Sequence, residues 1–293
     1  MPRARANGME IEYQTFGDPA DPTLLLVMGL GGQMILWHEE FCEALAARGH
    51  HVVRFDNRDV GLSTKLDHTG LPDVMGALSA VAQGRPIDAP YRLRDMADDA
   101  AGLLDALDLE SAHVVGASMG GMIAQTLAIE HPDRALTLTS IMSTTGEPGL
   151  PQARPEAMGA LLTPAPTERA AAIEHGLRLW RTIGSPGFPF DEGEVRERAA
   201  LAFDRGQSPA GVARQLVAIL ASGSRRAALA SVRAPTLVIH GAADPLIPVE
   251  AGRATAAAVP GAELLVIDGM GHDLPRALWP TFVDAIVKHA ARD

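Results

Sequence analysis

Apolar and polar residues follow two different periods along this chain. Short runs that are almost wholly apolar, such as Thr23–Met28 and Thr236–Gly241, are typical of strands covered on both faces of a sheet. Between these runs, longer segments such as Tyr91–Leu107 place apolar residues every three or four positions, which indicates amphipathic helices. Because strands and helices alternate, the pattern predicts an α/β fold with a mostly parallel, doubly wound sheet.

The expected strands and helices can be placed by residue number. The strands are Glu10–Thr15 at a half-exposed edge, Thr23–Met28, His51–Phe55, Ala112–Gly116, Ala135–Met142, Thr236–Gly241 and Glu263–Ile267. The helices are Trp37–Arg48, Tyr91–Leu107, Met119–Glu130, one that begins at Val249, and Pro275–Ala290. Leu66–Pro90 has a weak pattern, and we expect an irregular connection there.

The composition changes between residues 144 and 230, where no apolar strand is found. Prolines crowd its first part, and helices are expected over Thr167–Arg181, Glu194–Asp204 and Gly211–Leu220. A helical insertion between two strands of a parallel sheet would lie over the strand ends. We therefore expect a core domain of residues 1–143 and 231–293, with residues 144–230 as a helical cap inserted before the last two strands.

Ser118 lies where an apolar strand runs directly into a helix through a glycine-rich turn. The segment Gly116–Gly120 matches Gly-x-Ser-x-Gly, in which a strained turn lifts the serine hydroxyl clear of the sheet. Bulky side chains two residues to either side would collide, so glycines are needed there. The helix that follows directs its positive end toward the serine. The motif predicts a nucleophile for acyl transfer, and a turn with a capping serine is the structural alternative.

A serine nucleophile needs a base, and the base needs an acid that fixes its tautomer. His272 and Asp244 both follow expected strands, and the order Ser118, Asp244, His272 is the one found with this motif. The structural alternatives are a loop histidine that caps the last helix and an Asx-turn at Asp244. Asp268 and Asp273 flank the histidine and compete as the acid, although residues so close in sequence reach the outer ring nitrogen poorly.

Three further reactive residues are expected to be structural. His240 ends a strand and should support the adjoining loop, whereas His113 lies inside a strand and should be buried. Cys42, on one face of an expected helix, should belong to the core.

A tetrahedral intermediate also needs donors for its oxyanion, and backbone N–H groups are expected to supply them. The two are Met119, which follows the nucleophile, and Leu30 in the glycine loop Gly29–Gly32. A phosphate-binding loop is the rival interpretation, but this one lacks both the Lys-Ser/Thr ending of a P-loop and the spacing of a dinucleotide fingerprint. A plain flexible connection is the other alternative.

Length, composition and charge limit where the protein is expected to be located and which ligands it is expected to bind. The length of 293 residues suits one large α/β domain with an insertion. A net charge of -11 without a basic run argues against nucleic acid and anionic membrane surfaces as partners. The single cysteine, Cys42, allows neither an internal disulfide nor a Cys-rich metal cluster. No apolar stretch has the length of a signal peptide or membrane span, so we expect a cytoplasmic protein with a small, mostly uncharged ligand.

Five segments resemble the α/β-hydrolase superfamily, and together they span nearly the whole chain. They are Met28–Gly31, Asp56–Ser63, Gly116–Gly120, Gly241–Asp244 and Gly269–His272. Within the superfamily, Leu25–Gly29, Asp56–Ser63 and Gly269–His272 are most similar to the aclacinomycin methylesterase group of bacterial carboxylesterases. Many members of the superfamily carry histidine where this chain has Met28, and this group shares the methionine.

The resemblance implies a serine carboxylic-ester hydrolase that acts on a small-molecule ester. Ser118 would attack the ester carbonyl, His272 would transfer the proton and Asp244 would orient the histidine, without a metal or an organic cofactor. Haloalkane dehalogenases and epoxide hydrolases use an aspartate nucleophile, so Ser118 argues against both activities. Carbon–carbon bond hydrolases, enol-lactonases, haloperoxidases and perhydrolases share the triad and stay alternatives. So does a binding protein whose pocket only captures a ligand.

The segment 144–230 contains no motif that identifies the substrate. Three of its aromatic residues, Trp180, Phe188 and Phe190, are expected either to line the substrate pocket or to anchor the packing of the cap. A homodimer is left open by the sequence.

Overall fold

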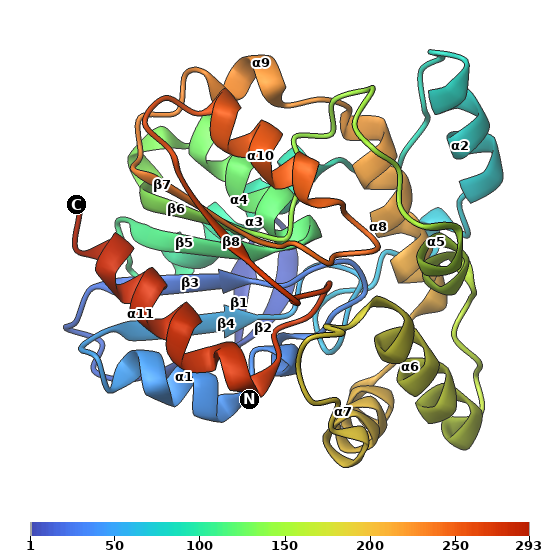
Figure 1. Cartoon of the computed structure of the whole chain (residues 1–293), viewed down its shortest axis with the longest axis horizontal. Coiled ribbons are helices and arrows are strands. Elements are labelled where there is room, and N and C mark those ends of the chain that lie inside the picture. The colour runs from blue at the N-terminus through green and yellow to red at the C-terminus, as the bar shows by residue number, and fades with distance from the viewer. Residues whose placement is uncertain (1, 293) are drawn as a thin grey trace.

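An eight-stranded sheet runs through the computed structural model, which describes residues 2–292 (Figure 1). The strand order across the sheet is β1-β2-β4-β3-β5-β6-β7-β8. The strands are β1 (Arg3–Ala6), β2 (Met9–Phe16), β3 (Thr23–Val27), β4 (His51–Phe55), β5 (Ala112–Ala117), β6 (Ala135–Ile141), β7 (Thr236–Gly241) and β8 (Glu263–Ile267).

The sheet is parallel from β4 through β8, whereas β2 pairs in the antiparallel direction with both of its neighbours, β1 and β4. Every residue of β3, β4, β5 and β7 is buried, which explains their nearly continuous apolar runs. The prediction that Glu10–Thr15 forms an edge strand is wrong, because these residues belong to β2, which lies between β1 and β4. β1 has the sequence Arg-Ala-Arg-Ala and buries only Ala6, so its pattern contains too few apolar residues to indicate a strand.

Helices cover both faces of the sheet, as a doubly wound fold requires (Figure 1). One face carries α3 (Leu93–Ala106), α4 (Met119–Glu130), α9 (Arg226–Leu229) and α10 (Val249–Ala258). The other face carries α1 (Glu39–Ala46) and α11 (Trp279–Ala290). The predicted fold class is confirmed.

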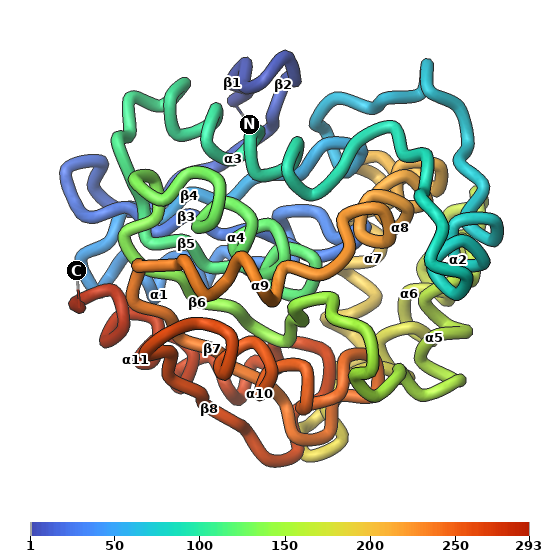
Figure 2. The backbone as a smooth tube through the Cα atoms, turned by 90° about the horizontal axis from the view of Figure 1, so that it is seen from above, coloured from blue at the N-terminus to red at the C-terminus, as the bar shows by residue number. Residues whose placement is uncertain are grey.

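Four of the five helices between β6 and β7 lie beside the carboxyl ends of the parallel strands, as Figures 1 and 2 both show. They are α5 (Pro155–Leu162), α6 (Arg169–Ile183), α7 (Glu192–Arg205) and α8 (Pro209–Ser222). The pattern predicted the last three and missed α5, which lies in the proline-rich part and begins on Pro155 itself. We call α5–α8 the cap helices, and the exact domain boundaries stay a prediction.

The expectation of an irregular connection over Leu66–Pro90 is wrong, because it contains helix α2 (Val74–Ala82). The Asp73 side chain caps this helix by accepting a hydrogen bond from the Gly76 amide. Its buried face is made of small residues packed toward α8, whereas Met75 and Val81 are exposed. Apolar residues therefore occur on both faces, and the helical period is lost.

None of the helices formed by residues 2–292 has both the length and the apolar content that crossing a bilayer requires.

Candidate active site

Ser118 occupies a strained turn between β5 and α4. Its φ of 56° and ψ of -120° place a non-glycine residue in a region that L-amino acids rarely adopt. Two hydrogen bonds hold this conformation: the Ser118 amide donates to the Ile141 carbonyl at 2.9 Å, and the Ser143 hydroxyl donates to the Ser118 carbonyl at 2.8 Å. The backbone of β6 and the Ser143 side chain, two residues beyond the strand, therefore fix the turn that presents the hydroxyl.

Gly116 and Gly120 allow this turn because the backbone segments pack without space for side chains. A Cβ atom on Gly116 would lie 2.1 Å from the Gly120 carbonyl oxygen. A Cβ atom on Gly120 would lie 2.0 Å from the Val27 carbonyl oxygen at the end of β3. Both distances are far below contact, so β5, α4 and β3 approach this closely only with glycine at both positions.

The structure brings Ser118, His272 and Asp244 together at the carboxyl edge of the sheet. The distance from His272 Nε2 to Ser118 Oγ is 2.9 Å, and the distance from His272 Nδ1 to Asp244 Oδ2 is 2.7 Å. Both bonds lie within ordinary hydrogen-bonding range, and the His272 and Asp244 side chains are buried. This chain of bonds can activate a hydroxyl, because the carboxylate fixes one ring nitrogen and leaves the other to accept the serine proton.

The Asx-turn that was the alternative for Asp244 is also present. Asp244 Oδ1 accepts hydrogen bonds from the amides of Leu246 and Ile247, each at 2.9 Å, while Oδ2 faces His272. The two interpretations are therefore compatible, since each carboxylate oxygen has its own partners.

The competing acidic residues have other positions. Asp268 is exposed, and the Asp273 carboxylate accepts a hydrogen bond from the Ser185 hydroxyl. Burial raises the pKa of Asp273 above its ordinary value. Ser185 also accepts a hydrogen bond from the Gly271 amide at 2.8 Å, and the His272 amide donates to the Ile183 carbonyl at 2.7 Å. The loop that follows α6 thus holds the histidine loop in place.

The remaining reactive residues have structural surroundings. His240 Nε2 donates to the Ile247 carbonyl at 2.8 Å, and burial lowers the pKa of His240. His113 is buried beside the hydroxyl of Thr137 at 3.1 Å. Cys42 is buried in the apolar core, which raises the pKa of its thiol to about 12.

The glycine loop after β3 lies directly against the serine. A Cβ atom on Gly29 would lie 3.0 Å from Ser118 Cβ, so only hydrogen fits comfortably there. The Gly32 amide donates to the Gly29 carbonyl at 3.1 Å and closes the loop into a turn. Within residues 2–292, the amides of Leu30 and Met119 have no hydrogen-bond acceptor. Two unpaired N–H groups beside a serine hydroxyl suit an oxyanion.

The three cap aromatic residues considered as pocket candidates, Trp180, Phe188 and Phe190, make packing contacts. Trp180 packs with Ile183 and Leu246 in a small apolar cluster, and Phe188 packs against the core cluster on the α11 face. Phe190 is 39% exposed and lies under the guanidinium of Arg181, 5.6 Å from its ring centroid. These contacts match the packing interpretation, and a role in the substrate pocket stays a prediction.

Sequence reasoning missed two buried ion pairs between the cap helices and the loop after β4. Arg205 lies 2.6 Å from Asp56, and Arg214 lies 2.7 Å from Asp59. Asp56 and Asp59 follow a buried strand in the sequence, and this pattern could have indicated that their carboxylates have buried partners. The arginines gave none, because a charged residue on an amphipathic helix normally faces solvent.

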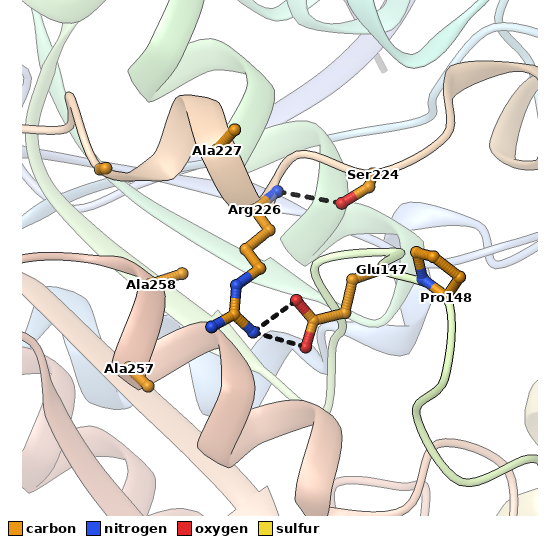
Figure 3. A pocket seen from close by; sticks show the side chains of 8 residues that line it. Glu147, Pro148, Ser224, Arg226, Ala227, Ala257 and Ala258 are labelled. Atoms are coloured by element: carbon orange, nitrogen blue, oxygen red, sulfur yellow. Dashed lines mark hydrogen bonds and ion pairs between the residues drawn. The ribbon is translucent and has the colours of Figure 1, made fainter.

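A depression elsewhere on the surface contains none of the predicted site residues (Figure 3). It has a volume of about 630 Å³, and Arg226 and Glu147 face each other across it in an ion pair of 2.7 Å. Ser224 in this depression accepts a hydrogen bond from the Arg226 amide and has no histidine among its lining neighbours. It therefore offers no activated nucleophile.

A family model described as the alpha/beta hydrolase fold matches residues 22–275. The chain belongs to the α/β-hydrolase family. Rhodomycin D methylesterase DnrP of Streptomyces peucetius is 35% identical, over 93% of this chain and 92% of that protein. The 3-oxoadipate enol-lactonase 2 of Acinetobacter baylyi is 29% identical, over 85% of this chain and 81% of the lactonase.

Solved structures of α/β-hydrolases share the same fold. The crystal structure of the enol-lactonase from Burkholderia xenovorans superposes with a TM-score of 0.72 and 23% identity. The match covers 99% of this hydrolase and 100% of the lactonase.

Proposed function

We propose that this α/β-hydrolase is a serine carboxylic-ester hydrolase. The observation that carries the proposal is the hydrogen-bonded series Ser118, His272 and Asp244, which begins at the strained turn between β5 and α4. The likeness to rhodomycin D methylesterase supports ester hydrolysis, and we propose a methyl ester of a larger carboxylic acid as the first substrate class to examine. The cytoplasmic location stays a prediction.

The reaction proceeds through an acyl-enzyme. Ser118 Oγ attacks the ester carbonyl carbon while His272 Nε2 accepts the hydroxyl proton, and the amides of Leu30 and Met119 donate hydrogen bonds to the oxyanion. Collapse of the tetrahedral intermediate breaks the ester bond, and the alcohol leaves with the proton from His272. Water then attacks the acyl group, its proton passes to His272, and the carboxylic acid is released as Ser118 regains its hydrogen.

Hydrolysis of aryl and methyl esters by wild type and Ser118→Ala tests this proposal. Because the nucleophile is lost, we expect kcat/KM to fall by about three to four orders of magnitude or more. Ser224→Ala is the matched control, since it removes a hydroxyl from the depression in Figure 3, and it should keep wild-type activity.

Two outcomes would contradict the proposal. Absence of turnover by wild type on every ester, lactone and vinylogous diketone assayed would favour a protein that only captures its ligand. Full activity of Ser118→Ala would mean that the nucleophile is misassigned.

A further inference from the structure

A cap residue reaches the loop beside the nucleophile. Gln215 on α8 has no exposed surface, and its Oε1 accepts a hydrogen bond from the Gly31 amide at 2.8 Å. Its Nε2 donates to the Arg58 carbonyl, also at 2.8 Å. Since both ends of the side-chain amide have partners, its orientation is determined, with the acceptor oxygen toward Gly31.

The conformation of the glycine loop explains why this bond matters. Gly31 has a φ of 64° at the third position of the turn that the Gly32 amide closes onto the Gly29 carbonyl. A positive φ at that position distinguishes a type II turn from a type I turn, and the two types differ by a rotation of the central peptide, here Leu30–Gly31. The hydrogen bond from the Gly31 amide to Gln215 fixes that peptide in one orientation.

Packing and a second hydrogen bond restrain the same loop. A Cβ atom on Gly31 would lie 2.9 Å from Val212 on α8, so helix and loop are in close contact. On the other side of the loop, Asn57 Nδ2 donates to the Met28 carbonyl at 2.8 Å. The amide of Leu30 lies between these two restrained points and has no acceptor among the described residues. Such an arrangement orients a donor in advance, which is the requirement for stabilising a developing charge.

We infer that Gln215 is a positioning residue for the glycine loop Gly29–Gly32, called the oxyanion loop below, so that cap helix α8 takes part in transition-state stabilisation. The inference rests on the proposed function, because it assigns Leu30 as an oxyanion donor. Gln215 does not touch the reacting atoms. It fixes the Leu30–Gly31 peptide and, through the Leu30 backbone, restrains the preceding Gly29–Leu30 peptide, which carries the Leu30 N–H.

Gln215→Met tests the inference. Methionine has a similar length but offers no strong acceptor, so the Gly31 amide loses its partner and the turn is free to change type. Misplacing one donor should lower kcat by about 10- to 100-fold, somewhat less than its complete removal. KM should stay within about threefold, since the interaction strengthens only in the transition state.

Ser222→Ala on the same helix is the matched control. The Ser222 hydroxyl accepts a hydrogen bond from the Leu93 amide at 2.9 Å, so this variant also removes an acceptor that α8 offers to a backbone amide of the core. Among the described residues, the hydrogen bonds of the Ser222 hydroxyl go to Leu93 and Ala218 and not to the oxyanion loop, so kcat of this variant should stay within about twofold of wild type. Thermal melts of both variants separate lost stability from lost chemistry.

A second measurement follows a single chemical step. A fluorophosphonate phosphonylates an activated serine with release of fluoride, and intact mass gives the rate at which Ser118 is labelled. The developing negative oxygen on phosphorus needs the same donors, so Gln215→Met should slow labelling by about the same 10- to 100-fold. Gln215→Leu provides a second variant without an acceptor and should behave alike.

The outcomes of the two proposals can be told apart. Inactive wild type would overturn the proposed function itself. Active wild type together with a kcat of Gln215→Met within about twofold would overturn only the positioning role. If both Gln215 variants fail to fold while Ser222→Ala folds, Gln215 is structural and the inference is equally overturned.

Discussion

Asp244 divides its two carboxylate oxygens between two tasks. One oxygen stabilises the loop after β7 through two backbone amides, and the other faces His272 at 2.7 Å. The same residue therefore builds the loop and orients the base, so the two roles can be separated by a substitution that preserves only one of them.

Asp244→Asn provides this separation. The asparagine oxygen can still accept the two loop amides, but its NH₂ group would donate to His272 Nδ1 and place the ring proton on the nitrogen that faces Ser118. Because that tautomer cannot accept the serine proton, we expect kcat to fall by about four orders of magnitude. Ester assays and thermal melts on one preparation check this, with the melting temperature staying near that of wild type. A kcat within tenfold of wild type would contradict the assignment of the acid.

Residues with a motif were predictable from the sequence, and residues without one were not. Ser118, Asp244 and His272 follow strand ends in a known order, so the order and the strand ends together imply that they meet. Gln215 could not be found in this way, because a polar residue on an amphipathic helix looks the same whether it faces water or a buried amide. The partner that distinguishes the two cases, Gly31, lies far away in the sequence.

At the scale of elements, α8 joins the cap helices to the loop after β4. Its Arg214 side chain is 1% exposed and binds both oxygens of Asp59, at 2.7 and 2.9 Å. Tyr91 and the Leu66 amide also donate to this carboxylate, each at 2.8 Å. The periodicity of the sequence predicted helix α8, but it could not predict that the polar residues Arg214 and Gln215 on this helix are buried against partners in the core.

Replacing Arg214 should destabilise the protein strongly. Arg214→Met leaves Asp59 charged and buried with only its two other donors, so we expect the free energy of unfolding to fall by about 3–5 kcal/mol. Urea unfolding measures the loss. Arg169→Met removes a surface ion pair in which Arg169 and Asp204 are each about half exposed, and the corresponding loss should be far smaller. If both variants lose the same free energy of unfolding, the buried Arg214–Asp59 pair contributes no more to stability than an exposed pair, and the expectation is wrong.

At the scale of the whole molecule, burial of histidines makes the free energy of unfolding depend on pH. Burial lowers the pKa of six of the ten histidines, in the case of His38 to about 4; the others are His50, His51, His175, His240 and His289. Below pH 6.5 the unfolded chain binds protons that the folded protein resists, so stability is lost as the pH falls through this range. Burial raises the pKa values of Asp99 and Asp273, which act in the opposite direction, but among residues 2–292 these two carboxyl groups are outnumbered by the six histidines.

Unfolding experiments between pH 7.5 and 4.5 check this expectation. The free energy of unfolding should fall on acidification, and His38→Gln should show a shallower decline because it lacks one of the depressed groups. Stability that is constant across this range in wild type, or an unchanged slope in His38→Gln, would contradict the argument.

The arrangement of elements far apart in the sequence was predictable only where it follows the general rules of strand and helix connection. Alternating strands and helices predicted the parallel sheet and the helical insertion before β7. The edge strand β1 and helix α2 were missed because short or small-residue elements receive their stability from contacts and not from a periodic pattern.

The buried pairs Asp56–Arg205 and Asp59–Arg214 have a consequence for how this hydrolase can change its specificity. Replacing residues 144–230 with the corresponding segment of a relative would leave Asp56 and Asp59 buried without their arginine partners, unless that relative has arginines at the matching positions. New substrate preferences are thus more readily acquired by exchanging single residues within the existing helices than by recombining whole segments. In a shuffled library, surviving chimeras should inherit the loop of residues 56–63 and the helices α7 and α8 from the same parent.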